Sequence, residues 1–180
     1  ANVTLISGPT NLQPPSKVKF IKVLTAKEMN ETVRKNSSKN DIFVFAAAVS
    51  DVSPKKTTAL KIKKEGFKRI LLKKNPDIIK NITLNSSKKT KFVVGFAAET
   101  ENLVGNAEVK LQQKNCDFVI ANPVGEPAKG AGIDSDENQG VLLTATGEQI
   151  TLPRAKKSIV ARQIFDELLQ RRPVRLTQEN

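Results

Sequence analysis

The chain has 180 residues, so one domain with a sizeable core is expected. Its single cysteine, Cys116, excludes an intramolecular disulfide and favours a reducing compartment. No apolar run approaches the roughly 20 residues that span a bilayer, so we expect a cytoplasmic protein with no membrane partner. Lys and Arg number 30 against 18 Asp and Glu, and the formal charge of +12 favours a polyanionic or phosphorylated ligand.

The basic residues are concentrated in residues 55–91, which hold 13 Lys or Arg and two acids. Such a patch is the usual footprint of a nucleic-acid-binding module, which stays an alternative. The chain has no Trp or Tyr, however, and its Phe residues lie mostly in apolar runs, so it offers few stacking platforms for bases. A basic arm that grips phosphates explains the charge at least as well, and we expect no nucleic-acid partner.

The first third of the chain predicts strands at residues 2–7 and 18–23 and a helix that ends near residue 36. Thr25 and Glu28 form a capping box at the start of this helix. The apolar run at residues 42–49 then predicts a buried parallel strand, which ends in the small residues 46–48 and is followed by Asp51.

Small side chains at the carboxyl end of a strand let a ligand approach the backbone, at the edge where open α/β sheets bind ligands. The carboxylate of Asp51 suits a ribose hydroxyl or a hydrated magnesium ion. A core strand followed by a solvated basic loop would produce the same pattern.

The middle of the chain predicts a short strand at residues 67–72 and then a helix. Asn75 is its expected N-cap, with Pro76 and Asp77 in the first turn. A buried strand at residues 92–97 again ends in small residues, and a helix over residues 101–115 presents Lys110 and Lys114 on one face.

The last third predicts a strand at residues 117–121, which leads to Asn122 and Pro123, and an irregular loop over residues 124–140. A hairpin follows, with strands at residues 141–144 and 149–152, and the chain closes with a helix over residues 155–170. The alternation of strands and helices predicts an α/β fold: a Rossmann-like, doubly wound, mostly parallel sheet with a C-terminal β-hairpin and helix.

We predict a single domain over residues 1–172 and a polar tail over residues 173–180. A Gly-rich phosphate loop between a first strand and a first helix is missing. We therefore expect the first βα unit of such a fold to precede Ala1.

Four segments together resemble one known family: AAAVSD at residues 46–51, KIKK at 61–64, KNPDI at 74–78 and VGFAAET at 94–100. Their order and spacing are similar to those of bacterial phosphopantothenoylcysteine synthetase, the carboxyl-terminal half of the bifunctional coenzyme A biosynthesis protein. The resemblance covers nearly the whole chain.

The resemblance implies a CTP-dependent ligase that uses Mg²⁺. CTP activates the carboxylate of 4′-phosphopantothenate as an acyl-cytidylate and releases pyrophosphate, and the amine of L-cysteine then attacks to give phosphopantothenoylcysteine and CMP. The family also implies a homodimer and a fused or associated decarboxylase domain, and FMN would belong to that absent half.

Carried over by position, Lys61 matches the essential lysine of the KxKK motif, on an arm that closes over the substrates and shields the attacking carboxylate from charge repulsion. Asp51 is the expected contact for Mg²⁺, and Asn122 is the candidate substrate-site residue, although Pro123 follows where the family reads Asp. The residues that match the cytidine nucleotide site are Phe45, Ala46, Ala47, Asp51, Lys61, Pro76, Asp77, Ile78, Ile79, Phe96, Lys110 and Lys114.

The family's catalytic asparagine, in a Ser-Asn-x-Ser-Ser-Gly motif, is expected before Ala1. Asn36 begins a similar Asn-Ser-Ser triplet but follows the first helix, so that role is not transferred to it. A nucleotide-cofactor oxidoreductase of Rossmann type is the second alternative, and the missing glycine fingerprint counts against it.

Overall fold

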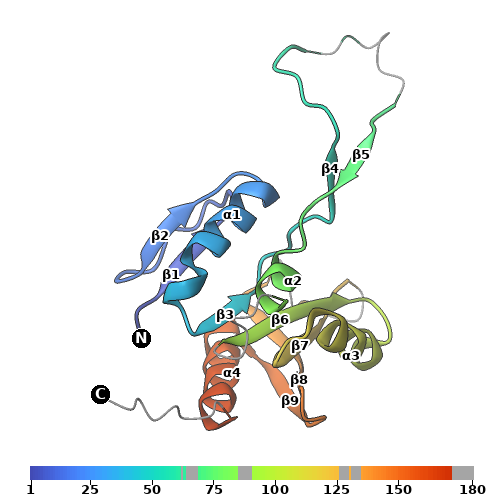
Figure 1. Cartoon of the computed structure of the whole chain (residues 1–180). Helices are drawn as coiled ribbons and strands as arrows, with labels where there is room; N and C mark the ends of the chain where they lie inside the picture. The colour runs from blue at the N-terminus through green and yellow to red at the C-terminus, as the bar shows by residue number, and fades with distance from the viewer. Residues whose placement is uncertain (62, 64–68, 85–90, 126–129, 131–134, 172–180) are drawn as a thin grey trace. The chain divides into compact units, whose positions relative to one another are not determined.

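The computed structural model describes residues 1–61, 63, 69–84, 91–125, 130 and 135–171 (Figure 1). These residues form two compact units. The first consists of Ala1–Asn40 with Ala47–Ile82, and the second of Asp41–Ala46 with Thr83–Asn180. The single domain over residues 1–172 stays a prediction, and the predicted tail lies outside the described residues.

The first unit begins with a parallel pair of strands, β1 (Thr4–Ser7) and β2 (Lys19–Lys22), followed by α1 (Ala26–Asn36) and a 3₁₀ turn, η1 (Ser37–Lys39). The predicted capping box is confirmed. The Glu28 amide donates to Thr25 Oγ1 at 3.1 Å, and the Glu28 carboxylate accepts from the Leu24 amide at 2.8 Å. One orphan amide of the helix, that of Glu28, is thus satisfied by the N-cap side chain, and the Glu28 carboxylate bonds the amide of the residue before the N-cap.

The first unit continues with an antiparallel ribbon of β4 (Val52–Pro54) and β5 (Leu72–Lys74), and then α2 (Ile78–Thr83). No strand was predicted at residues 52–54, because their strand conformation comes from pairing with residues 72–74. The strand predicted at residues 67–72 is displaced toward β5, although residues 67 and 68 lie outside the described part. Asn81 Nδ2 donates to the buried Asn30 Oδ1 at 2.8 Å and joins α2 to α1.

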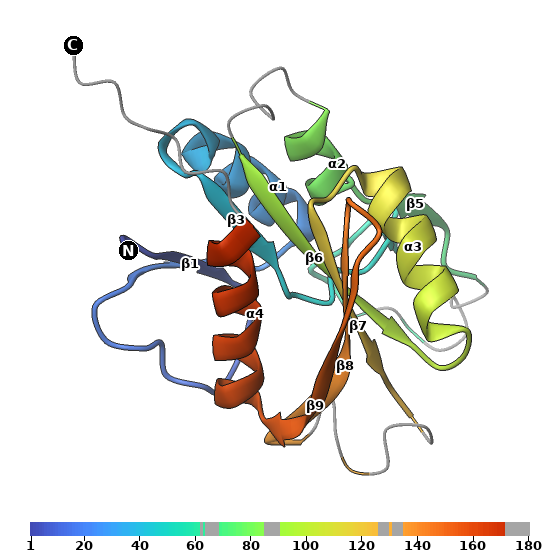
Figure 2. The ribbon, with the colours of Figure 1, turned by 90° about the horizontal axis from the view of Figure 1, so that it is seen from below.

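The second unit is a five-stranded sheet in the order β3 (Ile42–Phe45), β6 (Phe92–Glu99), β7 (Phe118–Pro123), β8 (Glu137–Thr144) and β9 (Gln149–Lys156). The first three strands are parallel, and the β8–β9 hairpin is antiparallel. Figure 2 shows α3 (Leu103–Lys114) and α4 (Lys157–Arg171) on opposite faces of this sheet. The predicted α/β fold with a C-terminal hairpin and helix is confirmed.

Three predicted boundaries in the second unit were wrong. The strand predicted at residues 42–49 ends at Phe45 and lies at an edge of the five-stranded sheet, where Val44 is 42% exposed. Glu137 to Gly140 belong to β8 rather than to a loop, because a bulge between Asn138 and Gly140 interrupts the alternation that marks a strand. The last helix begins at Lys157 because β9 continues to Lys156.

The core of the second unit lies between the sheet and α4. Phe92 and Phe118 meet edge to face at the parallel strands, with ring centroids 4.9 Å apart. The buried members of this cluster are Val94, Phe118, Ile120, Leu142, Leu152, Val160, Ile164 and Leu168. None of the helices in the described part of the chain is long and apolar enough to cross a membrane.

Gly140 lies where the parallel strands meet the hairpin. A Cβ atom at this position would be 2.1 Å from the carbonyl oxygen of Ala121 and 3.3 Å from Cα of Asn122. Real Cβ contacts with backbone are never this short, so only glycine lets β8 approach β7 here.

We expect Gly140→Ala to lower the free energy of unfolding by about 3 kcal/mol, because the added methyl group must push two backbones apart. Denaturant unfolding followed by circular dichroism would measure the change. Gly8→Ala is the control, since no atom lies within 4 Å of its added Cβ, and it should change stability by less than about 0.5 kcal/mol. Equal stabilities for the two variants would contradict the close approach.

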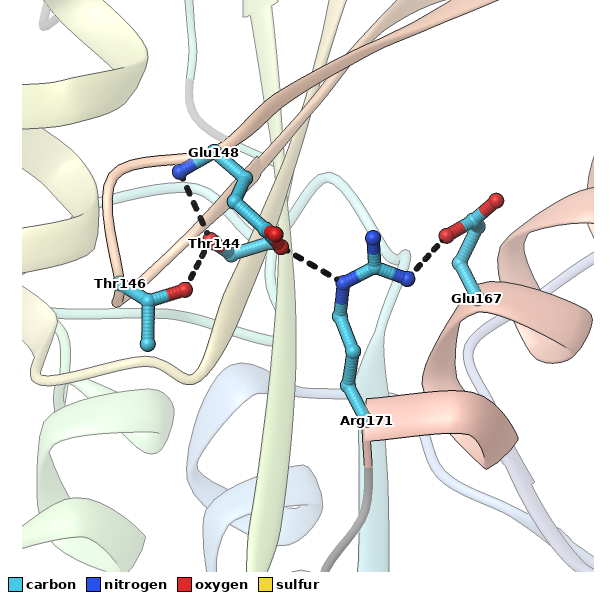
Figure 3. Close-up of polar contacts among 5 residues, drawn as sticks. All are labelled: Thr144, Thr146, Glu148, Glu167 and Arg171. Carbon is cyan, nitrogen blue, oxygen red and sulfur yellow. Dashed lines mark hydrogen bonds and ion pairs between the residues drawn. The ribbon is translucent and has the colours of Figure 1, made fainter.

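The C-terminal end of α4 is bound to the hairpin turn by Arg171 (Figure 3). Its Nε donates to Glu148 Oε2 at 2.7 Å, and its Nη1 donates to Glu167. The hydrogen bond to Glu148 raises the pKa of Arg171, desolvation opposes this rise, and the negative charges of both carboxylates add to it. Because the pKa is raised in the folded protein, the charged guanidinium stabilises the fold, and this stabilisation is lost only when the pH rises through that pKa. The guanidinium therefore stays charged at neutral pH.

Arg171→Leu should speed hydrogen exchange of the amides in the last turn of α4, because the helix end loses its two ionic partners. Molar salt should produce part of the same effect in the unmodified protein by screening these half-exposed pairs. Arg162→Leu, on the exposed side of the same helix, is the control and should leave the exchange unchanged. Unchanged protection in Arg171→Leu would show that the ion pairs do not hold the helix end.

Candidate functional site

The predicted site residues of the first unit are brought together by Asn75. Its backbone amide donates to the Asp51 carbonyl at 2.8 Å, and its side-chain Nδ2 donates to the Ser50 carbonyl at 2.9 Å. Asp51 is therefore held beside Pro76, the first of the four site residues 76–79. Asn75 belongs to a motif that the sequence singled out, but its role as this connector was not predicted.

The cap of α2 differs from the prediction. Asp77, not Asn75, is the N-cap, since its Oδ1 accepts from the Lys80 amide at 3.0 Å and its carbonyl accepts from the Asn81 amide at 3.0 Å. The helix begins at Ile78, so Pro76 precedes it. Asn75 does not cap the helix, because its backbone and side-chain donors bond the carbonyls of Asp51 and Ser50.

Lys61 lies in the connection between β4 and β5 and is exposed, as is Lys63. Residues 62 and 64 of the KxKK motif lie outside the described residues. Among the described residues of this connection and its two strands, every charged side chain is a cation: Lys55, Lys56, Lys61, Lys63, Arg69, Lys73 and Lys74. A ribbon of this composition attracts a polyphosphate.

Phe45 and Ala46 belong to the second unit, at the carboxyl end of β3, whereas Ala47 belongs to the first. The ring of Phe45 stacks on Phe43 with a centroid distance of 6.2 Å and an interplanar angle of 15°. Ala46 and Ala47 are exposed, so the small residues at this strand end are accessible as the sequence predicted.

A hydrogen bond joins Phe96 on β6 to Lys110 on α3. The Phe96 side chain packs against the core cluster on the α4 side of the sheet, and its carbonyl oxygen accepts a hydrogen bond from Lys110 Nζ on α3. Lys114 follows one turn later, at the end of α3, and also has a partner within the protein. An ammonium has three donors, so Lys110 keeps two for a ligand.

Asp51 is the candidate contact for a divalent cation. Its side chain is exposed. Within the described ranges, no group of three or more His, Cys, Asp or Glu side chains gathers. Magnesium is commonly bound by one or two carboxylates together with substrate phosphates and water. A lone exposed carboxylate beside a basic ribbon fits that mode and does not fit a cage made only of protein groups.

The carboxyl edge of the second unit carries two further polar groups. Asn122, at the end of β7, is only 6% exposed. Glu99, at the end of β6, accepts at Oε2 from Asn106 Nδ2, 2.9 Å away in the first turn of α3. The sequence quoted Glu99 within a motif but did not name it as a site residue. Its position directly after a run of small residues is the signal that could have done so.

Comparison with known proteins connects this arrangement to one family. Residues 1–171 match the family model described as DNA/pantothenate metabolism flavoprotein C-terminal domain. The coenzyme A biosynthesis bifunctional protein CoaBC of Escherichia coli (strain K12) is 37% identical over 175 residues, which cover 95% of this chain and 42% of that protein. The chain therefore spans less than half the length of this curated relative.

Two solved structures share the fold. The crystal structure of the C-terminal domain of CoaBC has a TM-score of 0.75 and 32% identity, with coverage of 94% of this chain and 74% of that one. A mutant of Cab2 in complex with phosphopantothenate-cysteine has a TM-score of 0.63 at 19% identity, with coverage of 86% of this chain and 53% of that one. The second likeness shows the fold alone. By its sequence and its fold, the chain belongs to the family of the DNA/pantothenate metabolism flavoprotein C-terminal domain.

Proposed function

We propose that the protein is a phosphopantothenate–cysteine ligase that uses CTP, and that an acyl-cytidylate is its intermediate. The observation that carries this proposal is the arrangement in the first unit, where Asn75 holds Asp51 beside residues 76–79, next to the basic β4–β5 ribbon that bears Lys61. The membership in the CoaBC C-terminal family supports it.

Lys61 acts in the first step. A carboxylate that attacks the α-phosphorus of a triphosphate approaches a centre surrounded by negative charge. An ammonium between the two groups offsets this repulsion most strongly as the new bond forms. Lys61 is exposed on the ribbon, and we infer that the ribbon brings it to the substrates when they are bound.

Asp51 and the lysines of α3 serve the triphosphate. A magnesium ion, when bound, neutralises part of the charge that develops on the phosphates. Asp51 would hold this ion through its hydrated shell, while Lys110 uses its free donors on a phosphate and stays fixed by the Phe96 carbonyl. The resemblance supports nucleotide-binding roles in each unit taken by itself: Ala47 and residues 76–79 in the first unit, and Phe45, Ala46, Phe96 and Lys114 in the second.

The second step joins the activated acyl group to L-cysteine. The cysteine amine attacks the acyl carbon, the bond to the cytidylate oxygen breaks, and CMP leaves as phosphopantothenoylcysteine forms. A Cab2 mutant, whose fold is similar, has a solved structure in complex with phosphopantothenate-cysteine, which is the product proposed for this chain.

The protein is further proposed to be a cytoplasmic homodimer that works with a fused decarboxylase domain. The support for the fusion is that the CoaBC relative is bifunctional and that this chain covers 42% of it. FMN would belong to the decarboxylase domain.

The decisive test is pyrophosphate release by the full-length protein supplied with 4′-phosphopantothenate, magnesium and each of the four nucleoside triphosphates. We expect release with CTP, and a loss of about 10³-fold in Lys61→Gln because the charge at the reacting phosphorus is gone. Lys35→Gln, an exposed lysine of α1, controls for the change in net charge and should keep full activity.

Pyrophosphate release with none of the four nucleotides would overturn the ligase proposal. Steeply salt-dependent binding of unrelated oligonucleotides would then favour a nucleic-acid-binding module. Retention on an immobilised nicotinamide cofactor would favour an oxidoreductase.

The connector role of Asn75 gives a second test. Asn75→Ala removes the side-chain bond to the Ser50 carbonyl and keeps the backbone bond to the Asp51 carbonyl, so Asp51 is held beside residues 76–79 by one hydrogen bond instead of two. We expect the KM for CTP to rise about tenfold, which corresponds to the net value of one such hydrogen bond, with the KM for 4′-phosphopantothenate unchanged. The exposed Asn11→Ala is the control. Equal increases in both KM values would contradict a role at the nucleotide.

A further inference from the structure

Helix α4 carries an apolar stripe on the side that is turned away from the sheet. The helix lies along one face of the five-stranded sheet and buries its opposite side in the core (Figure 2). Three of its large apolar side chains are nevertheless exposed: Ile159 by 49%, Phe165 by 44% and Leu169 by 61%. Each residue of a helix turns by about 100°, so these three positions share one side. A single exposed apolar residue is ordinary, but three together mark a surface that another element can cover.

Two opposite charges lie within the same stripe. Arg162 and Asp166 are both exposed and stand between the apolar positions. They are one helical turn apart, yet in the part of the chain that the structure describes neither side chain forms an ion pair or a hydrogen bond. A basic residue four positions before an acidic one is the weaker order for a pair within one helix. Both charges are therefore available to a partner.

The order of residues in this stripe is self-complementary. Ile159 and Leu169 lie five residues to either side of one midpoint, and Arg162 and Asp166 lie two residues to either side of the same midpoint. A second α4 packed antiparallel about a two-fold axis at that midpoint brings each position opposite its mirror position. Arg162 then faces the aspartate of the other copy, Ile159 faces the leucine, and Phe165 lies beside its own counterpart. A parallel pair would instead oppose like charges.

We propose that α4 pairs antiparallel with the α4 of a second copy of this chain, through the stripe of residues 159, 162, 165, 166 and 169. The shared midpoint of the apolar pair and the charged pair selects a second copy, because an unrelated surface gives no reason for it. One helix face from each copy is smaller than a standard interface of about 1,600 Å², so we expect a dissociation constant in the micromolar range. This inference names an interface for the proposed homodimer and does not depend on the ligase chemistry.

Site-directed crosslinking of the full-length protein tests the arrangement. Phe165→Cys should crosslink two copies, because the two thiols lie beside the axis. Ile159→Cys and Leu169→Cys should each give no crosslink alone, since the two copies of either position are about 15 Å apart along the helices. A mixture of these two variants should crosslink, with a bifunctional maleimide that spans less than that distance.

Val109→Cys is the matched control, because Val109 is an exposed apolar residue of the other long helix on this sheet, with 51% exposure. It should crosslink no more than the unmodified protein, in which Cys116 is buried. Equal yields from Val109→Cys and Phe165→Cys would overturn the proposal, as would a crosslink in Ile159→Cys alone.

Charge reversal tests the ion pairs that set the register. In the Phe165→Cys background, Arg162→Asp and Asp166→Arg should each lower the crosslinking yield at micromolar protein about tenfold or more, because like charges then oppose each other twice across the axis. The two substitutions together restore both pairs and should return the yield to within about threefold. A combined variant as weak as the single ones, with an unchanged circular dichroism spectrum, would contradict the pairing.

Two further readouts separate this interface from the other proposals. In protein diluted below the dissociation constant, the Phe165→Cys thiol should react with a monofunctional maleimide; an unreactive thiol would show that another segment of the full-length chain covers α4, and the proposal would fail. A protein that sediments as a dimer without the crosslink keeps the homodimer and loses this interface. Crosslinking without pyrophosphate release keeps the interface and loses the ligase.

Discussion

The second unit depends on the close approach of β7 and β8 at Gly140. Without a side chain at this position, the backbone of β8 lies against the Ala121 carbonyl, and a parallel set of strands can continue into an antiparallel hairpin. The hairpin in turn carries α4, whose buried side chains complete the core with Val94, Ile120 and Leu152. The same approach brings β8 against the backbone of Asn122, which is nearly buried.

The first unit buries a few apolar side chains, among them Val33, Ile78 and Ile82, and adds a polar connection. Asn75 uses its backbone and side-chain donors on two successive carbonyls, Asp51 and Ser50, and so fixes the start of α2 against the end of the preceding segment. The β4–β5 ribbon emerges between these two points, and the described residues of the ribbon itself carry no carboxylate that would balance its charge. A basic ribbon suits the proposed reaction between two anionic substrates, since their repulsion must be offset when both are bound.

The distribution of charge fits the proposed function. Residues 55–91 hold 13 of the 30 Lys and Arg residues, and Lys61 is among them. Lys61, Asp51 and Lys110 are the charged groups that we propose for the phosphates and their metal ion, and the structure fixes Lys110 by its hydrogen bond to the Phe96 carbonyl.

Local pattern determined much of this protein. The sequence predicted the features that depend on neighbours along the chain. These are the Thr25–Glu28 capping box, the apolar strands β6 and β7, the helices and the small residues at strand ends. The resemblance carried by the segments around Asp51, Lys61 and Phe96 identified the family before any packing was known.

Tertiary structure decided the rest, because partners distant in sequence set it. Strand β4 exists only through pairing with β5, and Glu137 to Gly140 join β8 only because a bulge and a missing Cβ let β7 approach. Asn75 had the sequence of a helix cap, yet it reaches back 25 residues to Ser50 and leaves the cap to Asp77. The burial of Asn122 at the end of β7 could not be recognised from the sequence, since burial depends on the whole fold around a residue.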